Sequence, residues 1–213
     1  MKSVILKISL PFFLTCFSIG MNAQNYFGYR AGINLANVSK TEDGFITKER
    51  IPGITAHLLL DFTLADNLSL QPELGFLQKG YRKTITLFGE KRYATTIHYV
   101  DISASLKYRF GSKKLKGHVL AGPYAGLAIS GKTKDLDDGS TNDVRIEEGG
   151  GINRPDLGLT FGAGVGIPIR EGDLFLDARY LLGLVIMAND LDNGDLKNRG
   201  FNFSLGYIFR IGR

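Results

Sequence analysis

Long apolar runs, cysteine and histidine are what this sequence has least of. No stretch of the 213-residue chain stays apolar for the roughly 20 residues that a transmembrane helix needs, which excludes a helical membrane protein. The only cysteine, Cys16, lies in a segment that we expect to be removed, so the mature chain has no disulfide. Three histidines in the whole chain leave few candidates for acid–base catalysis.

The N-terminal segment is typical of a secretory signal peptide. Two lysines precede an apolar run that ends at a small-residue cleavage site before Gln24. We therefore predict a signal peptide over residues 1–23 and one domain over residues 24–213. The formal net charge of +5 falls by two when the signal is removed, and no basic stripe with interleaved aromatic residues is present, so we expect no nucleic-acid partner.

The clearest structural signal is the stretch RPDLGLTFGAGVGI, residues 154–167, whose alternate positions differ completely. One set is apolar, and the other is small or polar and includes four glycines. Successive side chains of a strand point to opposite faces, so this stretch predicts a strand with one apolar face and one small face. Four glycines would make a poor solvated face. They indicate the crowded, curved inside of a narrow barrel whose apolar face contacts lipid.

The same alternation recurs along the chain and predicts eight strands. Each is long enough to cross a bilayer at a tilt, for which roughly 9 to 11 residues suffice. The predicted strands lie at residues 26–36, 53–62, 68–79, 97–110, 118–130, 154–167, 174–185 and 200–210. The connections alternate between short turns and long polar loops, and the long loops are residues 37–50, 82–95, 131–153 and 188–199.

Short turns on one side and longer loops on the other are typical of outer-membrane barrels. We therefore predict an all-β fold, an eight-stranded antiparallel up-and-down transmembrane β-barrel in a bacterial outer membrane. Its partners would be the outer-membrane lipid and, during biogenesis, the barrel-insertion machinery.

Charges of both signs recur on the predicted inward faces. They are Arg30, Asp61, Glu73, Asp101, Lys107, Arg109, Asp177 and Arg179. Side chains just fill a barrel of eight strands, so a diffusion pore is not expected. Because an unpaired charge is costly in a confined interior, we predict that these groups pair into a network that locks the barrel. The alternative is a narrow proton or ion path.

Short motifs recur in a fixed order along nearly the whole mature chain. They are Gly28-x-x-x-Gly32-x-Asn34, Leu70-Gln71-Pro72-Glu73-Leu74 with Lys79-Gly80, Tyr99-Val100-Asp101-Ile102, Asp156-x-Gly158, Gly162-Ala163-Gly164, and Arg179-Tyr180 with Gly183-Leu184. Together they resemble the PorT-like outer-membrane β-barrel domain family of Bacteroidetes-type bacteria. The resemblance implies a small outer-membrane barrel, and some family members are tied to protein secretion or gliding. Ser103 stands where the family often has proline.

We predict a structural, surface-interaction or secretion-linked role, and two other functional classes are alternatives to it. A lipid A-modifying enzyme would need a histidine near a serine and an acid. His98 is expected at head-group height, but Ser103 and Ser105 lie five and seven residues away, so we predict no enzyme activity. A secreted lipocalin-like carrier would place the apolar faces inside, around a lipophilic ligand.

The long loops are the remaining candidate sites. Loops 131–153 and 188–199 are rich in aspartate and could hold calcium. Neither fits the EF-hand register, because Ser140 stands where glycine is required after Asp135. We predict solvated loops with no metal or cofactor. An extracellular or secretion partner would bind through one or more of the four long loops.

Overall fold

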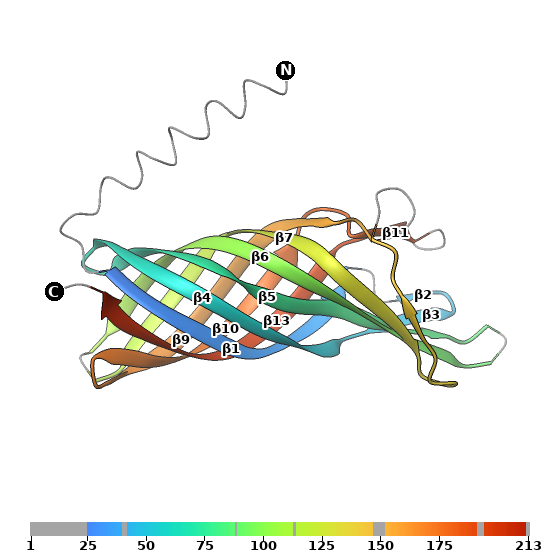
Figure 1. The fold of residues 1–213 in the computed structure, drawn as a ribbon, viewed down its shortest axis with the longest axis horizontal. Helices are drawn as coiled ribbons and strands as arrows, with labels where there is room; N and C mark the ends of the chain where they lie inside the picture. The colour runs from blue at the N-terminus through green and yellow to red at the C-terminus, as the bar shows by residue number, and fades with distance from the viewer. Residues whose placement is uncertain are drawn as a thin grey trace, which may run out of the picture.

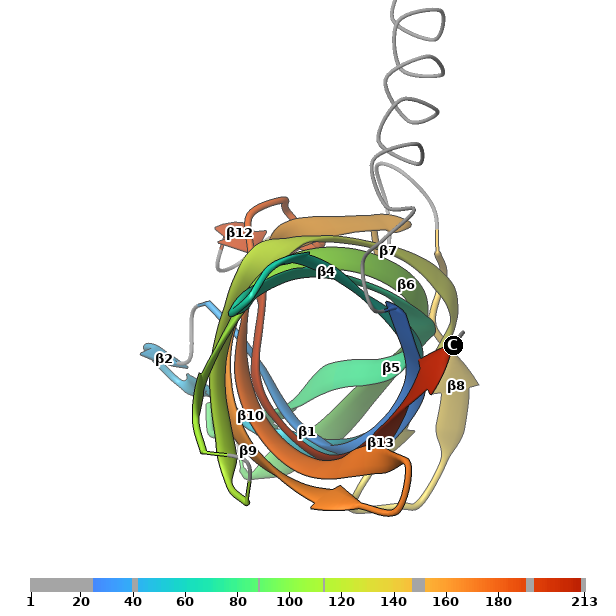
Figure 2. The same cartoon turned by 90° about the vertical axis from the view of Figure 1, so that its left-hand side faces the viewer.

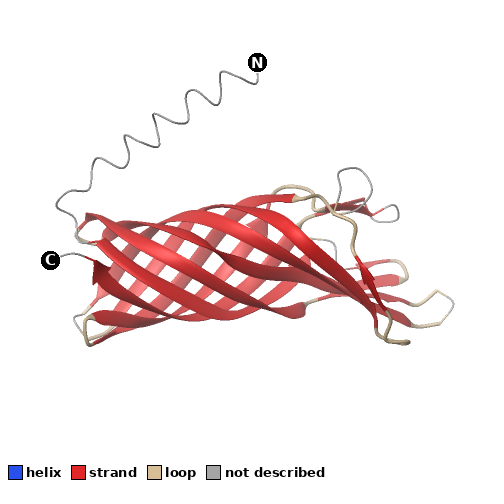
Figure 3. Ribbon diagram, in the orientation of Figure 1, coloured by secondary structure: helices blue, strands red, loops and turns tan. Residues whose placement is uncertain are grey.

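The computed structural model describes residues 25–39, 42–87, 89–112, 114–146, 152–190 and 194–211, and the predicted signal peptide lies outside these ranges. Within them, no helix has the length and apolar character needed to cross a bilayer. Eight long strands dominate the structure (Figures 1 and 3). They are β1 (Asn25–Val38), β4 (Ile51–Ala65), β5 (Leu68–Ile85), β6 (Lys91–Gly111), β7 (Lys116–Asp135), β9 (Pro155–Ile169), β10 (Gly172–Gly183) and β13 (Asn198–Ile211).

These strands form a closed ring. Each pairs antiparallel with the next along the chain, and β13 returns to pair with β1 from Asn25↔Ile211 to Val38↔Asn198. The view along the axis shows the ring directly (Figure 2). The eight predicted strands and the up-and-down order are therefore confirmed. Closure leaves no free edge among the eight strands, so their backbone groups pair within the sheet, as a bilayer requires.

The two faces of the sheet have the predicted orientation. Leu58 and Ile102 point outward and are 54% and 57% exposed, whereas Asp61 and Gln71 point inward and are fully buried. Apolar side chains on the outside and polar ones within are the pattern of a barrel surrounded by lipid. This orientation is the reverse of the one that a lipocalin-like carrier needs.

The inward glycines make room for large neighbouring side chains. A Cβ atom on Gly164 would collide with the imidazole of His118 and the carboxylate of Asp177. A Cβ on Gly162 would lie 2.8 Å from Cγ of Arg179. The interpretation of the glycine-rich face as a crowded interior is therefore confirmed.

The outer connections contain more strand than the sequence predicts. The prediction of a loop over 82–95 is wrong for most of its length, because β5 continues to Ile85 and β6 begins at Lys91, and the two residues pair. The other long loops contain short strands, which are β2 (Glu42–Asp43), β3 (Ile46–Glu49), β8 (Thr141–Asp143), β11 (Ala188–Asp190) and β12 (Gly194–Leu196).

These extensions have a simple physical cause. Beyond the bilayer both faces of a strand meet water, so the alternation of apolar and polar residues disappears although backbone pairing continues. β3 pairs with the end of β5, and β8 pairs with the end of β7. Together with the ends of β5, β6 and β7, they form a sheet that projects beyond the barrel, at the end opposite Asn25 and Ile211, the termini of the described chain (Figure 1). We call it the outer sheet.

The interior contains two apolar clusters with polar layers between them. The outer cluster comprises Val38, Ile97, Tyr99, Ala128, Ile152, Met187 and Leu196. Backbone N–H groups of Met187 and Asn153 donate to the carbonyls of Leu196 and Met187, both at 2.7 Å, and so hold the connecting segments over the barrel. A smaller cluster of Leu59, Phe175 and Ile208 lies toward the end with the termini.

Candidate functional site: the interior charge network

Glu73 is the centre of the interior network. Strand β5 directs its carboxylate inward, where Nε of Arg30 and Nη1 of Arg179 each donate to it at 2.7 Å. Nε2 of Gln71 donates a third hydrogen bond at 2.6 Å. One carboxylate thus joins arginines that lie on β1 and β10, more than 100 residues apart along the chain. Charge-assisted hydrogen bonds of this kind are the strong ones in a confined interior.

Asp177 extends the network from the other side of Arg179. Nη2 and Nε of Arg179 donate to one carboxylate oxygen of Asp177 at 2.6 and 3.0 Å. Nε2 of His118 lies 2.6 Å from the other oxygen. Arg30 is held further by the neutral side chains of Asn202 and Ser204, at 3.0 and 3.4 Å. The donors of both arginines therefore have several acceptors.

A looser group lies nearer the end with the termini. Asp61 is fully buried, and its carboxylate is 3.6 Å from Nζ of Lys107 and 3.5 Å from Nη1 of Arg109. Lys107 also donates to Oε1 of Gln71 at 2.9 Å, which connects this group to Glu73. All eight charged residues singled out from the sequence thus point inward, and seven of them belong to one connected set.

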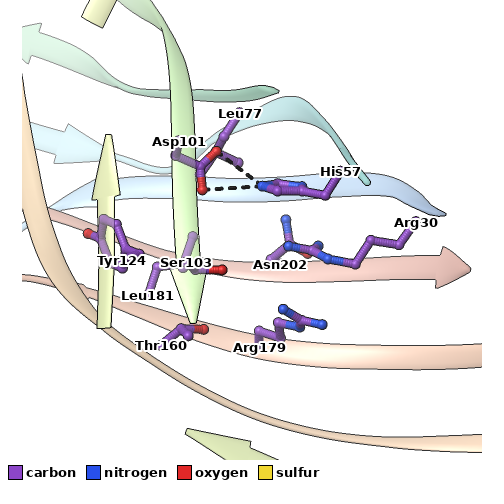
Figure 4. Close-up of a pocket in the computed structure, with 10 residues that line it drawn as sticks. All are labelled: Arg30, His57, Leu77, Asp101, Ser103, Tyr124, Thr160, Arg179, Leu181 and Asn202. Carbon is purple, nitrogen blue, oxygen red and sulfur yellow. Dashed lines mark hydrogen bonds and ion pairs between the residues drawn. The ribbon is translucent and has the colours of Figure 1, made fainter. Parts of the chain in front are cut away.

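The eighth, Asp101, pairs on the outer side of the network. Its carboxylate lies 3.1 Å from Nε2 of His57, and Nδ1 of His57 is 3.1 Å from Oγ1 of Thr55. Figure 4 shows this pair beside Arg30 and Arg179.

Sequence reasoning missed an ion pair farther out. Nζ of Lys79 donates to Asp156 at 2.5 Å and lies over the ring of Tyr124, 4.4 Å from its centroid. His57 and His118 were also left out of the predicted network. The signal was available, because all four residues occupy inward positions of the alternating pattern. The alternating pattern does not predict which of these residues contact one another across the barrel.

Small cavities remain between these layers. One of about 10 Å³ is lined by Arg30, His57, Asp101 and Arg179 among others (Figure 4). Another of about 30 Å³ is lined by Asp61, Lys107 and Arg109 among others. A single water molecule needs a cavity of about 10 to 15 Å³. Neither cavity is therefore large enough for a hydrated ion.

The histidine considered for catalysis is on the wrong face of its strand. His98 points outward, where its ring stacks on Phe76 at 5.6 Å and Nδ1 lies 3.2 Å from Nε2 of Gln78. Ser105 is fully buried and Ser103 lines the interior cavity, so both serines are on the opposite face of β6. His98 and these serines do not form the constellation that nucleophilic catalysis requires.

Two aspartates of the loop over 131–153 bind the chain itself. The carboxylate of Asp137 accepts hydrogen bonds from the backbone N–H of Arg92 at 2.9 Å and from its guanidinium at 3.2 Å. The backbone hydrogen bond, reinforced by the guanidinium, holds the pKa of Asp137 below its usual value. Hydrogen bonds from Ser140 likewise lower the pKa of Asp138.

No group of three or more metal-ligating side chains occurs among the described residues. Glu147, Glu148 and Asp192 lie outside the described ranges, and the side chains of Asp190 and Asp195 are not described either.

A closed ring with an apolar exterior and an ion-paired interior defines the class as a transmembrane β-barrel. Residues 22–189 match the family described as outer membrane protein beta-barrel domain, so the chain belongs to this family and to the bacterial outer membrane. No curated protein matches it in sequence.

Solved structures with related folds include three outer-membrane proteins. Neisserial surface protein A is 15% identical, with 87% of this chain and 97% of that one covered and a TM-score of 0.47. The attachment invasion locus protein Ail of Yersinia pestis is 15% identical, with 87% and 99% covered and a TM-score of 0.46. The outer membrane protease OmpT of Escherichia coli is 9% identical, with 89% and 96% covered and a TM-score of 0.43.

Proposed function

We propose that the protein is a non-enzymatic, PorT-like outer-membrane barrel with a closed interior, which serves a structural, surface-interaction or secretion-linked role through its outer connections. The observation that carries the proposal is the pairing of charges inside the barrel. A protein that transports ions or solutes through its own barrel needs a continuous wet path, whereas this interior is filled with paired side chains.

The charges that line the eight long strands balance. Five basic residues and five carboxylates point into the barrel. The basic residues are the buried Arg30, Lys79, Lys107 and Arg179 and the partly buried Arg109, and the carboxylates are the buried Asp61, Glu73, Asp101, Asp156 and Asp177. Ion pairs join nine of these groups, and Asp101 pairs with His57 instead. The formal charges of these ten groups sum to zero.

The outer end provides a second barrier. The apolar cluster around Ile97, Tyr99 and Met187 lies beyond the charged layers, and these three side chains are at most 1% exposed. An ion that crossed the network would next meet a dry apolar layer, where its desolvation is costly. This supports a plugged barrel more than the proton or ion path.

Function would then reside in the outer connections. The outer sheet is a paired extension of β5, β6 and β7, so it is more rigid than a polar loop of the same length. Binding surfaces commonly evolve on connections that a rigid scaffold holds in place. We propose that an extracellular or secretion partner docks on the outer sheet, in keeping with the protein secretion to which some members of the PorT-like family are tied.

Planar-bilayer recording tests the closed interior. The mature protein, which we propose begins at Gln24, should give a silent bilayer. The Glu73→Gln variant, if folded, should also remain silent because the outer apolar cluster is intact. A steady conductance in the wild-type protein that Glu73→Gln alters would overturn the proposal in favour of an ion path. A changed lipid A mass spectrum on overexpression would instead favour an enzyme.

A further inference from the structure

Two exposed arginines mark one sector of the outer membrane interface. Arg199 on β13 is the cross-strand partner of Asn37 on β1. On the other side of β1, the last residue pair with β4 is Ala36↔Ile51, and Arg50 directly precedes Ile51. Within the described ranges neither arginine has a carboxylate within ion-pair distance, and Glu49, the neighbour of Arg50, pairs with Arg82 instead. Both guanidinium groups are therefore available to an external anion.

Aromatic side chains place these arginines at head-group level. The guanidinium of Arg50 lies over the ring of Phe201, 5.3 Å from its centroid. Phe201 contacts Tyr180 on β10, with ring centroids 5.0 Å apart. A row of outward aromatic residues on adjacent strands is typical of the girdle where hydrocarbon meets head groups. The cation–π contact orients Arg50 just outside that girdle.

An apolar groove crosses the same strands below the aromatic row. It has a volume of about 740 Å³, and its lining runs from β1 across β13, β10 and β9 to Gly117 on β7 and Phe110 on β6. On β1, β13, β10 and β9 it lies between two rows of outward side chains. The upper row is Ile33, Phe203, Ala178 and Ala163, and the lower row is Ala31, Leu205, Leu176 and Val165. The alanines leave the backbone as the floor of the groove. Across the four strands it extends roughly 14 Å at a spacing of about 4.8 Å per strand.

The distance between the arginines and the groove is comparable to the distance between the phosphate and the acyl chains of one lipid. Phe203 is four residues from Arg199 along β13, which corresponds to roughly 13 Å. A lipid whose phosphate contacts Arg50 and Arg199 would therefore have its acyl chains at the depth of Phe203, in the part of the groove on β1 and β13. Guanidinium groups match phosphate oxygens in geometry as well as in charge.

We propose that this sector, comprising Arg50, Arg199, Phe201 and the groove around Ala178, is a specific binding site for a phosphorylated glycolipid of the outer leaflet. The phosphate selects the lipid through the two arginines, and the groove selects an acyl chain. The site would fix one lipid molecule on the β1, β13, β10 and β9 side of the barrel, distinct from the surrounding lipids that exchange freely.

Native mass spectrometry of the detergent-solubilised full-length mature protein, titrated with bisphosphorylated lipid A, tests the proposal. The wild-type protein should retain one lipid A molecule, and the double variant Arg50→Gln/Arg199→Gln should bind it about tenfold more weakly. Arg210→Gln is the matched control, since Arg210 also lies over an aromatic ring, that of Tyr26 at 6.0 Å, but on the opposite end of the barrel. This control should bind as the wild type does.

Two further binding measurements separate the contribution of the phosphate groups from that of the groove. Dephosphorylated lipid A should bind the wild type as weakly as lipid A binds the double variant, and inorganic phosphate should not compete. Ala178→Leu fills the groove and should weaken binding while both arginines remain. Equal retention by the double variant and the wild type would overturn the proposal, as would retention of lipid A that does not depend on its phosphates. The heat-dependent gel shift of each variant verifies that it is folded.

Discussion

Glu73→Gln is the most informative substitution in the interior, because it removes one charge and almost no volume. The carboxylate accepts from Arg30 and Arg179 at 2.7 Å each, and hydrogen bonds to charged groups contribute about 1.5 to 3 kcal/mol apiece. Arg179 retains Asp177, at 2.6 Å, whereas Arg30 retains only neutral acceptors. The loss therefore falls mainly on Arg30, and we expect a destabilisation of about 3 to 5 kcal/mol, as for other broken buried pairs.

Urea titration of the protein in lipid vesicles measures this loss. The chain has no tryptophan, so the folded fraction is best read from the mobility of unheated samples on a detergent gel. Adding Arg30→Met to Glu73→Gln removes the orphaned charge and should recover part of the stability, with a coupling of about 0.5 to 3 kcal/mol between the sites. A loss below about 1 kcal/mol for Glu73→Gln, or purely additive effects in the double variant, would refute the view that a tight charge network locks the barrel.

Three other predictions address the faces and the outer sheet. Leu106→Arg on the lipid face should cost about 2 to 4 kcal/mol near the midplane, whereas Thr160→Ser inside should be mild; equal tolerance in urea titrations would reject the assignment of faces. Gly164→Val should prevent folding or reduce the folded yield severely, because its Cβ would overlap two interior side chains, and a normal heat-dependent gel shift would contradict this crowding. The lowered pKa of Asp137 means that its contact with Arg92 stabilises the turn above its unfolded pKa, about 3.9, and is lost as the pH falls through the lower folded value. The protection of the Arg92 amide, its exchange rate relative to the intrinsic rate, should fall as the pH drops below about 4 in the wild type and be low at every pH in Asp137→Ala. Protection that does not change with pH in the wild type would argue against the contact.

Much of the fold could be predicted because the relevant signal is local. Whether Leu58 or Asp61 faces lipid depends only on the parity of its position in the strand, and parity is read directly from the sequence. Strand ends such as Ile85 and Lys91 could not be predicted, since outside the bilayer no lipid imposes the alternation on which the prediction depends. The short strands of the outer sheet escaped prediction for the same reason.

The sequence by itself determined which faces are apolar, how many strands cross the membrane and which charges point inward. Only the tertiary structure determined which of the inward side chains contact one another. Lys79 and Asp156 are 77 residues apart, and they pair because the relative register of the strands around the closed ring brings their inward positions together. The apolar cluster over the outer mouth likewise joins residues from strands and connections that no periodic pattern links. Side-chain direction is a property of a few consecutive residues, whereas contact across a barrel depends on the registers of all its strands at once.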